Sequence, residues 1–170
     1  MQQPGPDNAI WDDGEWVTWD EINDQIQCQE WRAKYPNANL ALVEVFESLL
    51  STAQSYHMQT GRHLQVYGDI GELYGAITHG IKLHRNYAQG SDGKLGNDFV
   101  EVKTITPFKT NDTITLNMRR HFSKILIVKI SADFEVRGKL IPRKSLSKGA
   151  SSKLVINWSD FRSDQLQASA

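Results

Sequence analysis

The sequence is poor in several residue types and patterns, and each absence narrows what the protein can be. Cys28 is its one cysteine, which excludes an intramolecular disulfide and a zinc cage built from cysteines. A lone thiol fits a reducing compartment, so we expect a cytoplasmic protein. No apolar run approaches the length of a membrane span, and the first residues show no basic-then-apolar signal pattern. We therefore expect no membrane partner.

The signature motifs of three large enzyme classes are also missing. The sequence has no G-x-x-x-x-G-K-[ST] phosphate loop and no H-E-x-x-H zinc helix. It has no G-x-S-x-G nucleophile elbow either. Cys28 lies in an acidic amphipathic segment with no evident base beside it, so we expect a structural role for it.

Charge is divided unevenly along the chain. Residues 1–81 carry 3 Lys or Arg and 12 Asp or Glu, a net charge of −9, whereas residues 82–153 carry 15 and 6, a net charge of +9. A basic region is what a phosphodiester substrate calls for electrostatically. The alternative is that the two halves pack against each other through their opposite charges, and the two interpretations are compatible.

Helix signals dominate the first half of the sequence. A capping box from Thr18 to Glu21 predicts a helix to about Lys34, after a leader whose Trp side chains should be tucked against the surface. Apolar residues spaced at three and four predict a helix over 39–60 with Gly61 as its stop. Its expected apolar face comprises Leu42, Val45, Phe46, Leu49, Leu50 and Ala53. A third helix is predicted over 68–79, where small residues would allow close packing on a sheet.

Strand signals dominate the second half. The segment 124–130 is the most hydrophobic and is predicted to be central in a sheet. Shorter strands are predicted at 81–84, 98–105, 113–116, 134–140 and 154–158, with a helical turn over 117–123. We expect an α+β fold in which a mixed sheet is flanked by helices. Its expected divisions are a leader and helical extension (1–66), a core (67–162) and a flexible tail (163–170).

The segment from Gly90 to Thr106 contains the candidate catalytic residues Asp92, Glu101 and Lys103. It predicts a β-hairpin whose second strand places Glu101 and Lys103 on one face, with Val100 and Val102 on the other. Two charged side chains in an otherwise apolar strand carry a desolvation penalty. A divalent metal bound by Glu101, with Asp92 as a second carboxylate across the turn, would offset that penalty.

Asp92 followed nine residues later by Glu101-Val102-Lys103 resembles the motif of the PD-(D/E)XK nuclease superfamily, which has the restriction-endonuclease-like fold. The resemblance covers residues 67–158, and Ser91 stands where the family often has proline. It implies that Asp92 and Glu101 bind Mg²⁺, which Mn²⁺ can replace. It also implies the Val102 carbonyl as an extra ligand, and Glu72 of the preceding helix as a ligand directly or through water. Lys103 would then orient the attacking water.

The expected function is a metal-dependent nuclease that hydrolyses phosphodiester bonds in nucleic acid. A DNA endonuclease with a restriction, repair or phage-linked role is favoured, although these residues alone do not separate DNA from RNA. Cutting both strands usually takes two sites, which would make the active unit a homodimer. The candidate phosphate contacts are Lys109, Arg119, Arg120, Arg143 and Lys144. Two alternatives stay open. The chain could be a non-catalytic member that binds nucleic acid or a partner protein, or Glu101 and Lys103 could be a plain charge pair in an unrelated domain.

Overall fold

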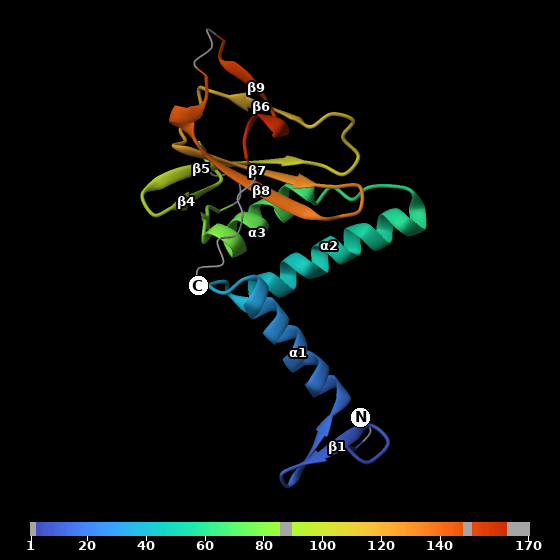
Figure 1. Cartoon of the computed structure of the whole chain (residues 1–170). Helices are drawn as coiled ribbons and strands as arrows, with labels where there is room; N and C mark the ends of the chain where they lie inside the picture. The colour runs from blue at the N-terminus through green and yellow to red at the C-terminus, as the bar shows by residue number, and fades with distance from the viewer. Residues whose placement is uncertain (1–2, 86–89, 148–150, 163–170) are drawn as a thin grey trace.

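The computed structural model describes residues 3–85, 90–147 and 151–162 of the chain (Figure 1). These residues form three α-helices and several β-strands, which confirms the predicted mixed α+β class. The predicted flexible tail, residues 163–170, lies outside the described residues. No helix in the described part of the chain combines the length and the apolar character that crossing a membrane requires.

The leader is a small β-hairpin rather than a segment draped over the core. Strands β1 (Ala9–Asp12) and β2 (Glu15–Thr18) pair around Asp13-Gly14, both of which have positive φ. Trp11 and Trp16 lie directly opposite each other with ring centroids 5.3 Å apart. The expectation of tucked Trp side chains is wrong, because the hairpin lies at the far end of α1 and Trp11 is 60% exposed (Figure 1).

Helix α1 (Trp19–Lys34) begins at the predicted capping box. The Thr18 side chain accepts from the Glu21 N–H, and the Glu21 carboxylate accepts from the Thr18 N–H. These reciprocal bonds satisfy two of the backbone donors that a helix start leaves free. The sequence therefore predicted this boundary correctly from local chemistry alone.

Helix α2 (Leu40–Thr60) ends at Gly61, whose φ of 67° is the left-handed conformation expected of a glycine stop. Its buried residues are Val43, Phe46 and Ala53. The predicted apolar face was partly wrong, since Leu42 and Val45 are exposed. The helix is apolar on more than one side, so packing against α3 selects the buried face.

Helix α3 (Tyr67–His79) lies directly on the main sheet. A Cβ added to Gly71 would lie 2.0 Å from Thr104 Oγ1, and one added to Gly75 would lie 2.8 Å from Leu126. The predicted close approach of this helix to a sheet is confirmed. It brings the neighbouring Glu72 to the strand that carries the E-x-K motif.

The main sheet has five strands in the order β3–β4–β5–β7–β8. Their bounds are β3 (Lys82–Leu83), β4 (Gly93–Leu95), β5 (Asp98–Ile105), β7 (Lys124–Ile130) and β8 (Val136–Pro142). β5 and β7 are parallel, and the other pairs are antiparallel. β7 lies between β5 and β8, which confirms its predicted central place.

A second sheet, formed by β6 (Thr113–Asn117) and β9 (Lys153–Asn157), packs on the face of the main sheet that α3 does not cover. Ile105, Ile125 and Ile127 point into this second layer. Val100, Val102 and Leu126 belong to the apolar cluster on the α3 side. The helical turn predicted over 117–123 is wrong, because this connection is a non-helical loop. Short 3₁₀ turns, η1 (Arg143–Ser145) and η2 (Trp158–Asp160), follow β8 and β9.

Candidate functional site

Strand β4 is short, and this leaves one edge of β5 open. Gly93 of β4 pairs with Val100, and β4 is not paired with the rest of β5 beyond this point. Asp92 comes next, and its backbone N–H donates to the Val100 carbonyl at 3.0 Å. Its carboxylate Oδ2 accepts the Val102 N–H at 2.7 Å. A side chain therefore takes the hydrogen bond that a longer β4 would have taken, and Asp92 is fixed beside the E-x-K motif.

The Glu101 carboxylate lies almost entirely out of solvent, with 1% of the side chain exposed. Its Oε1 lies 2.7 Å from Lys103 Nζ and 2.6 Å from an Arg120 nitrogen. Its Oε2 is buried and has no hydrogen-bond partner among the residues that the structure describes. A buried carboxylate oxygen without a partner is costly, so this atom is where a further cation or donor would be most favourable.

Arg120 joins the two carboxylates. It comes from the loop between β6 and β7, and its two terminal nitrogens lie 2.6 Å from Glu101 Oε1 and 3.8 Å from Asp92 Oδ1. Both carboxylates therefore face one guanidinium, which shows that they point to a common space. The charge pair of Glu101 and Lys103 therefore extends through Arg120 to Asp92.

Glu72 is an electrostatic neighbour of this group. Partial burial raises the pKa of its carboxyl, with Asp92, Asp69 and Glu101 raising it further and Lys103 opposing them. Glu72 comes from the helix on one face of the sheet, whereas Glu101 shares the other face with Ile105. The two glutamates can approach each other only around the open edge of β5.

A metal ion at this site would have two carboxylate ligands, Asp92 and Glu101. Across residues 3–85, 90–147 and 151–162, no group of three or more His, Cys, Asp or Glu side chains is arranged to hold a metal. Mg²⁺ is commonly bound through one or two carboxylates with water completing its shell, so a third protein carboxylate is not required. Asp92 and Glu101, with the partnerless Glu101 Oε2, fit that donor set.

The Val102 carbonyl is oriented to the same edge. Within an extended strand the N–H and C=O of one residue point to the same side. Because the Val102 N–H is donated to Asp92, its carbonyl also faces the Asp92 side rather than β7. This direction suits the extra ligand that the sequence predicted.

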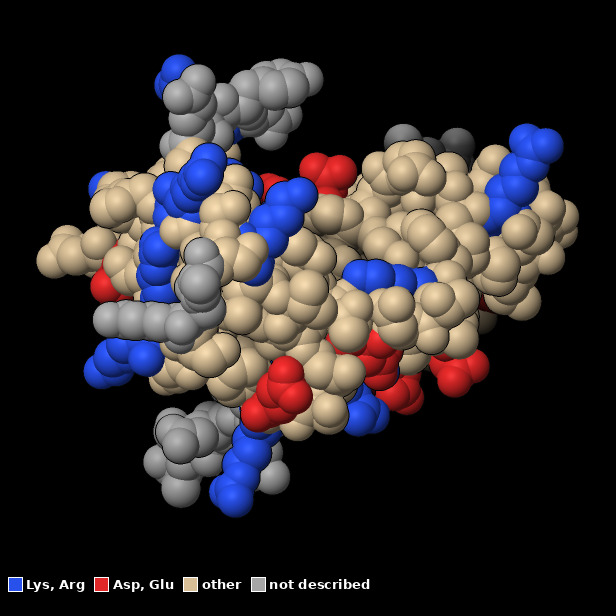
Figure 2. Space-filling view, turned by 90° about the horizontal axis from the view of Figure 1, so that it is seen from above, with Lys and Arg blue, Asp and Glu red and all other residues tan. Residues whose placement is uncertain are grey.

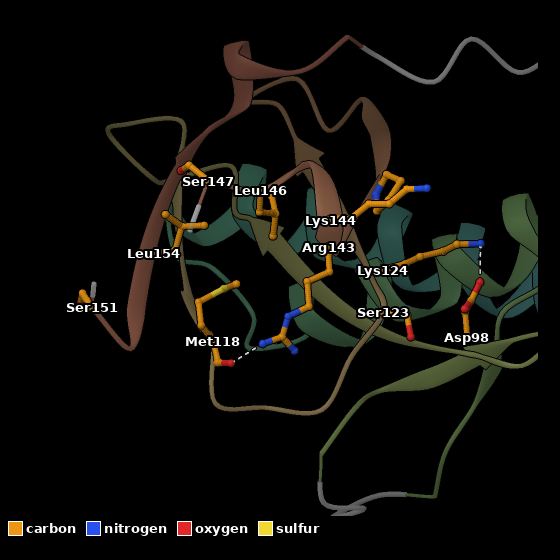
Figure 3. A pocket seen from close by; sticks show the side chains of 11 residues that line it. Asp98, Met118, Ser123, Lys124, Arg143, Lys144, Leu146, Ser147, Ser151 and Leu154 are labelled. Carbon is orange, nitrogen blue, oxygen red and sulfur yellow. Dashed lines mark hydrogen bonds and ion pairs between the residues drawn. The ribbon is translucent and has the colours of Figure 1, made fainter. Parts of the chain in front are cut away.

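Two of the five predicted phosphate contacts, Arg120 and Arg143, are in contact with each other. Arg143 donates to the carbonyls of Met118 (2.5 Å), Arg120 (2.9 Å) and Phe122 (3.2 Å), and its guanidinium lies 4.5 Å from the centroid of the Phe122 ring. Figure 3 shows it directed at the Met118 carbonyl. Arg143 thus holds in place the loop that carries Arg120. Sequence reasoning missed this role, because it depends on residues more than twenty positions apart.

The remaining three predicted contacts are exposed. Arg119 precedes Arg120 in the same loop, Lys144 lies in η1, and Lys109 donates to the Thr113 carbonyl in the connection before β6. Figure 2 shows most of the visible Lys and Arg side chains on one half of the face that it presents. Such a distribution favours an anionic partner.

A cavity of about 850 Å³ is lined in part by Met118 and Ser123 of the loop between β6 and β7 (Figure 3). Its walls come from the beginning of β5 and β7, the end of β8 and the β6–β9 layer. Within it, the Lys124 ammonium lies 2.8 Å from the Asp98 carboxylate. Met118 and the Arg143 that holds its carbonyl both line the cavity, but neither Asp92 nor Glu101 does.

Comparisons with known proteins add no family to this picture. No protein-family model matches the chain, and no curated protein sequence is significantly similar to it. The geometry of Asp92, Glu101, Lys103 and Arg120 is therefore what points to a function.

Proposed function

We propose that this chain is a metal-dependent nuclease that hydrolyses phosphodiester bonds, and that it is a DNA endonuclease of the PD-(D/E)XK kind. The observation that carries the proposal is the hydrogen bond from the Val102 N–H to the Asp92 carboxylate. It holds a carboxylate from a turn against the strand that bears Glu101 and Lys103. This is the convergence that the sequence resemblance requires.

The sheet topology supports the finer proposal of a restriction-endonuclease-like core. Helix α3 precedes an antiparallel hairpin, β4–β5, and the chain then returns to place β7 parallel to β5. One feature departs from the expected layout of a sheet flanked by helices. The face opposite α3 is covered by the β6–β9 sheet rather than by a helix.

The proposed metal ligands are the carboxylates of Asp92 and Glu101 and the carbonyl of Val102, with Glu72 acting through water. A bound Mg²⁺ would supply an activated water and stabilise negative charge on the phosphate. Glu72 is suited to an outer position, because it approaches from the other face of the sheet and its carboxyl pKa is raised by burial and by neighbouring carboxylates.

Lys103 is the proposed catalytic amine. Its Nζ lies 2.7 Å from Glu101 Oε1, and a third of its side chain is exposed. The ammonium group is therefore anchored beside the carboxylates while still open to solvent and substrate. In this position it can orient an attacking water and stabilise the charge that develops on the phosphate oxygens.

A cleavage assay tests the proposal. Labelled duplex DNA and single-stranded RNA are incubated with the protein in Mg²⁺ or Mn²⁺, with EDTA as the metal-free control. We expect cleavage of the DNA that disappears in EDTA and in Asp92→Ala and Lys103→Ala. Unchanged cleavage by both variants would remove this site assignment, and cleavage of RNA alone would redirect the substrate class.

One observation favours a second candidate, a non-catalytic module that binds nucleic acid. Arg120 lies against both carboxylates, so the pair is partly neutralised without any metal. Such a module would bind DNA in a salt-sensitive manner and would not cleave it with any divalent metal. A cytoplasmic location and a homodimeric active unit remain parts of the main proposal.

A further inference from the structure

We infer that Arg120 is a displaceable counterion, which occupies the carboxylate site in the metal-free protein and must leave Glu101 when a divalent metal binds. This inference rests on the proposed metal site. It adds a role for one residue that neither the E-x-K motif nor the resemblance assigns, namely control of metal entry.

The Glu101 carboxylate is shielded from solvent, and the cations of Lys103 and Arg120 lie against it. The Glu101 side chain is 1% exposed, whereas Lys103 and Arg120, the two cations on its Oε1, are about one third exposed. A metal arriving from solvent therefore meets these cations before it meets the carboxylate. Lys103 extends from the same strand two residues away, but Arg120 comes from a separate loop and can move independently of β5.

Charge gives the reason for displacement. The guanidinium spans the space between Glu101 Oε1 at 2.6 Å and Asp92 Oδ1 at 3.8 Å, which is the space between the two proposed metal ligands. A divalent cation and a guanidinium in the same space repel each other strongly at low dielectric. Within the described part of the chain Glu101 Oε2 has no hydrogen-bond partner, and Asp92 Oδ1 has only a long contact with Arg120, so Arg120 satisfies the two carboxylates only in part.

The loop that carries Arg120 is fixed by its backbone. Arg143 holds the carbonyls of Met118, Arg120 and Phe122, so the backbone at position 120 stays in place when the side chain moves. The Arg120 guanidinium can then exchange partners by changes of side-chain rotamer alone. This separates the exchange from unfolding of the loop.

Metal affinity tests the inference directly. Mn²⁺ is titrated by calorimetry into the wild-type protein, Arg120→Ala, Asp92→Asn and the matched control Arg119→Ala, which removes the same charge from the neighbouring exposed position. We expect Arg120→Ala to bind Mn²⁺ about tenfold more tightly than wild type, because a binding-competent site is no longer masked. Arg119→Ala should bind within about twofold of wild type, and Asp92→Asn should lose binding.

A second measurement follows the Arg120 side chain itself in the wild-type protein. In the ¹⁵N spectrum of arginine Nε–Hε groups, the Arg120 signal is assigned from its absence in Arg120→Lys. We expect Mg²⁺ to shift this signal while the Arg143 signal stays unchanged, because Arg143 remains on its three carbonyls. This measurement also covers the case in which Arg120→Ala is too unstable to titrate.

The possible results separate the inference from the proposed function. Equal or weaker Mn²⁺ binding by Arg120→Ala, with Asp92→Asn still losing it, overturns the role of Arg120 and keeps the metal site. An Arg120 signal that does not respond to Mg²⁺ while the wild-type protein binds metal also overturns that role. Absence of binding in every protein overturns both. Binding by Arg120→Ala alone supports the inference and indicates that the guanidinium blocks the site.

Discussion

The backbone N–H of Val102 donates a 2.7 Å hydrogen bond to Oδ2 of Asp92, and this bond fixes the hairpin carboxylate beside Glu101 and Lys103. It also makes Asp92 a structural residue, since its carboxylate replaces a missing ladder partner of β5. Function and stability can nevertheless be separated at this position, because an amide oxygen can accept the same hydrogen bond without supplying the charge.

Asp92→Asn should therefore keep the fold and lose catalysis. We expect its melting temperature to stay within about 3 °C of wild type, which corresponds to about 1 kcal/mol in a chain of this size. DNA cleavage in Mg²⁺ should fall by about 100-fold or more, because a charged metal ligand is gone. Asp98→Asn in the same hairpin is the control and should cleave within about twofold of wild type, since Asp98 pairs with Lys124. Equal losses in both variants would contradict the assignment.

Gly71→Ala should disrupt the contact of α3 with β5. The added Cβ would lie 2.0 Å from Thr104 Oγ1, so helix or strand must shift. We expect a loss of about 1–3 kcal/mol in the free energy of unfolding, measured by urea denaturation. Gly68→Ala in the same helix has nothing within 4 Å of its new Cβ and should gain about 0.5–1 kcal/mol. A neutral Gly71→Ala would show that the helix does not pack this closely.

Glu72→Gln should stabilise the metal-free protein at neutral pH. Burial, and then the charges of Asp92 and Asp69, raise the pKa of the Glu72 carboxyl in the folded state. The folded protein then binds this proton more tightly than the unfolded chain, so the stability that Glu72 contributes is present at low pH and is lost as pH rises through the folded-state pKa.

Melting temperatures measured in EDTA at a series of pH values test this direction of the pH dependence. Relative to wild type, the melting temperature of Glu72→Gln should rise as the pH increases from the ordinary pKa of a glutamate carboxyl to neutrality. Glu44→Gln, which removes a carboxylate from an exposed position on α2, is the matched control. A Glu72→Gln variant that becomes less stable as pH rises would mean that Glu72 has a cationic partner instead of carboxylate neighbours.

Arg143→Gln should loosen the loop that carries Arg120. Three carbonyls lose a charged donor and the Phe122 ring loses its guanidinium, so we expect a loss of about 2 kcal/mol or more. Lys144→Gln next to it is exposed and should change the free energy of unfolding by no more than about 0.5 kcal/mol. If Arg143 mainly contacted phosphate, its loss would instead weaken DNA binding without lowering stability, which denaturation and binding measurements together would reveal.

Much of the fold could be predicted because its signals are local. The start of α1 at Thr18, the end of α2 at Gly61 and the alternation of β5 each depend on residues within a few positions of one another. The convergence of Asp92 on the E-x-K strand was also predictable, since both belong to one hairpin.

The parts that could not be predicted depend on distant residues. Arg120 reaches Glu101 across nineteen positions, and its loop is held by Arg143, so neither contact leaves a local pattern. The buried face of α2 was misassigned for the same reason, because α3 decides which apolar side is covered. The exposed Trp11 and Trp16 pack edge to face against each other in the β1–β2 hairpin, whereas composition alone suggested burial.

Anomalous diffraction from a crystal soaked in Mn²⁺ would locate the metal between Asp92 and Glu101. We expect a peak within about 2.5 Å of carboxylate oxygens of both residues, with the Arg120 guanidinium moved away from Glu101. A soaked crystal with no peak between these carboxylates, and with Arg120 still paired to Glu101, would contradict this expectation.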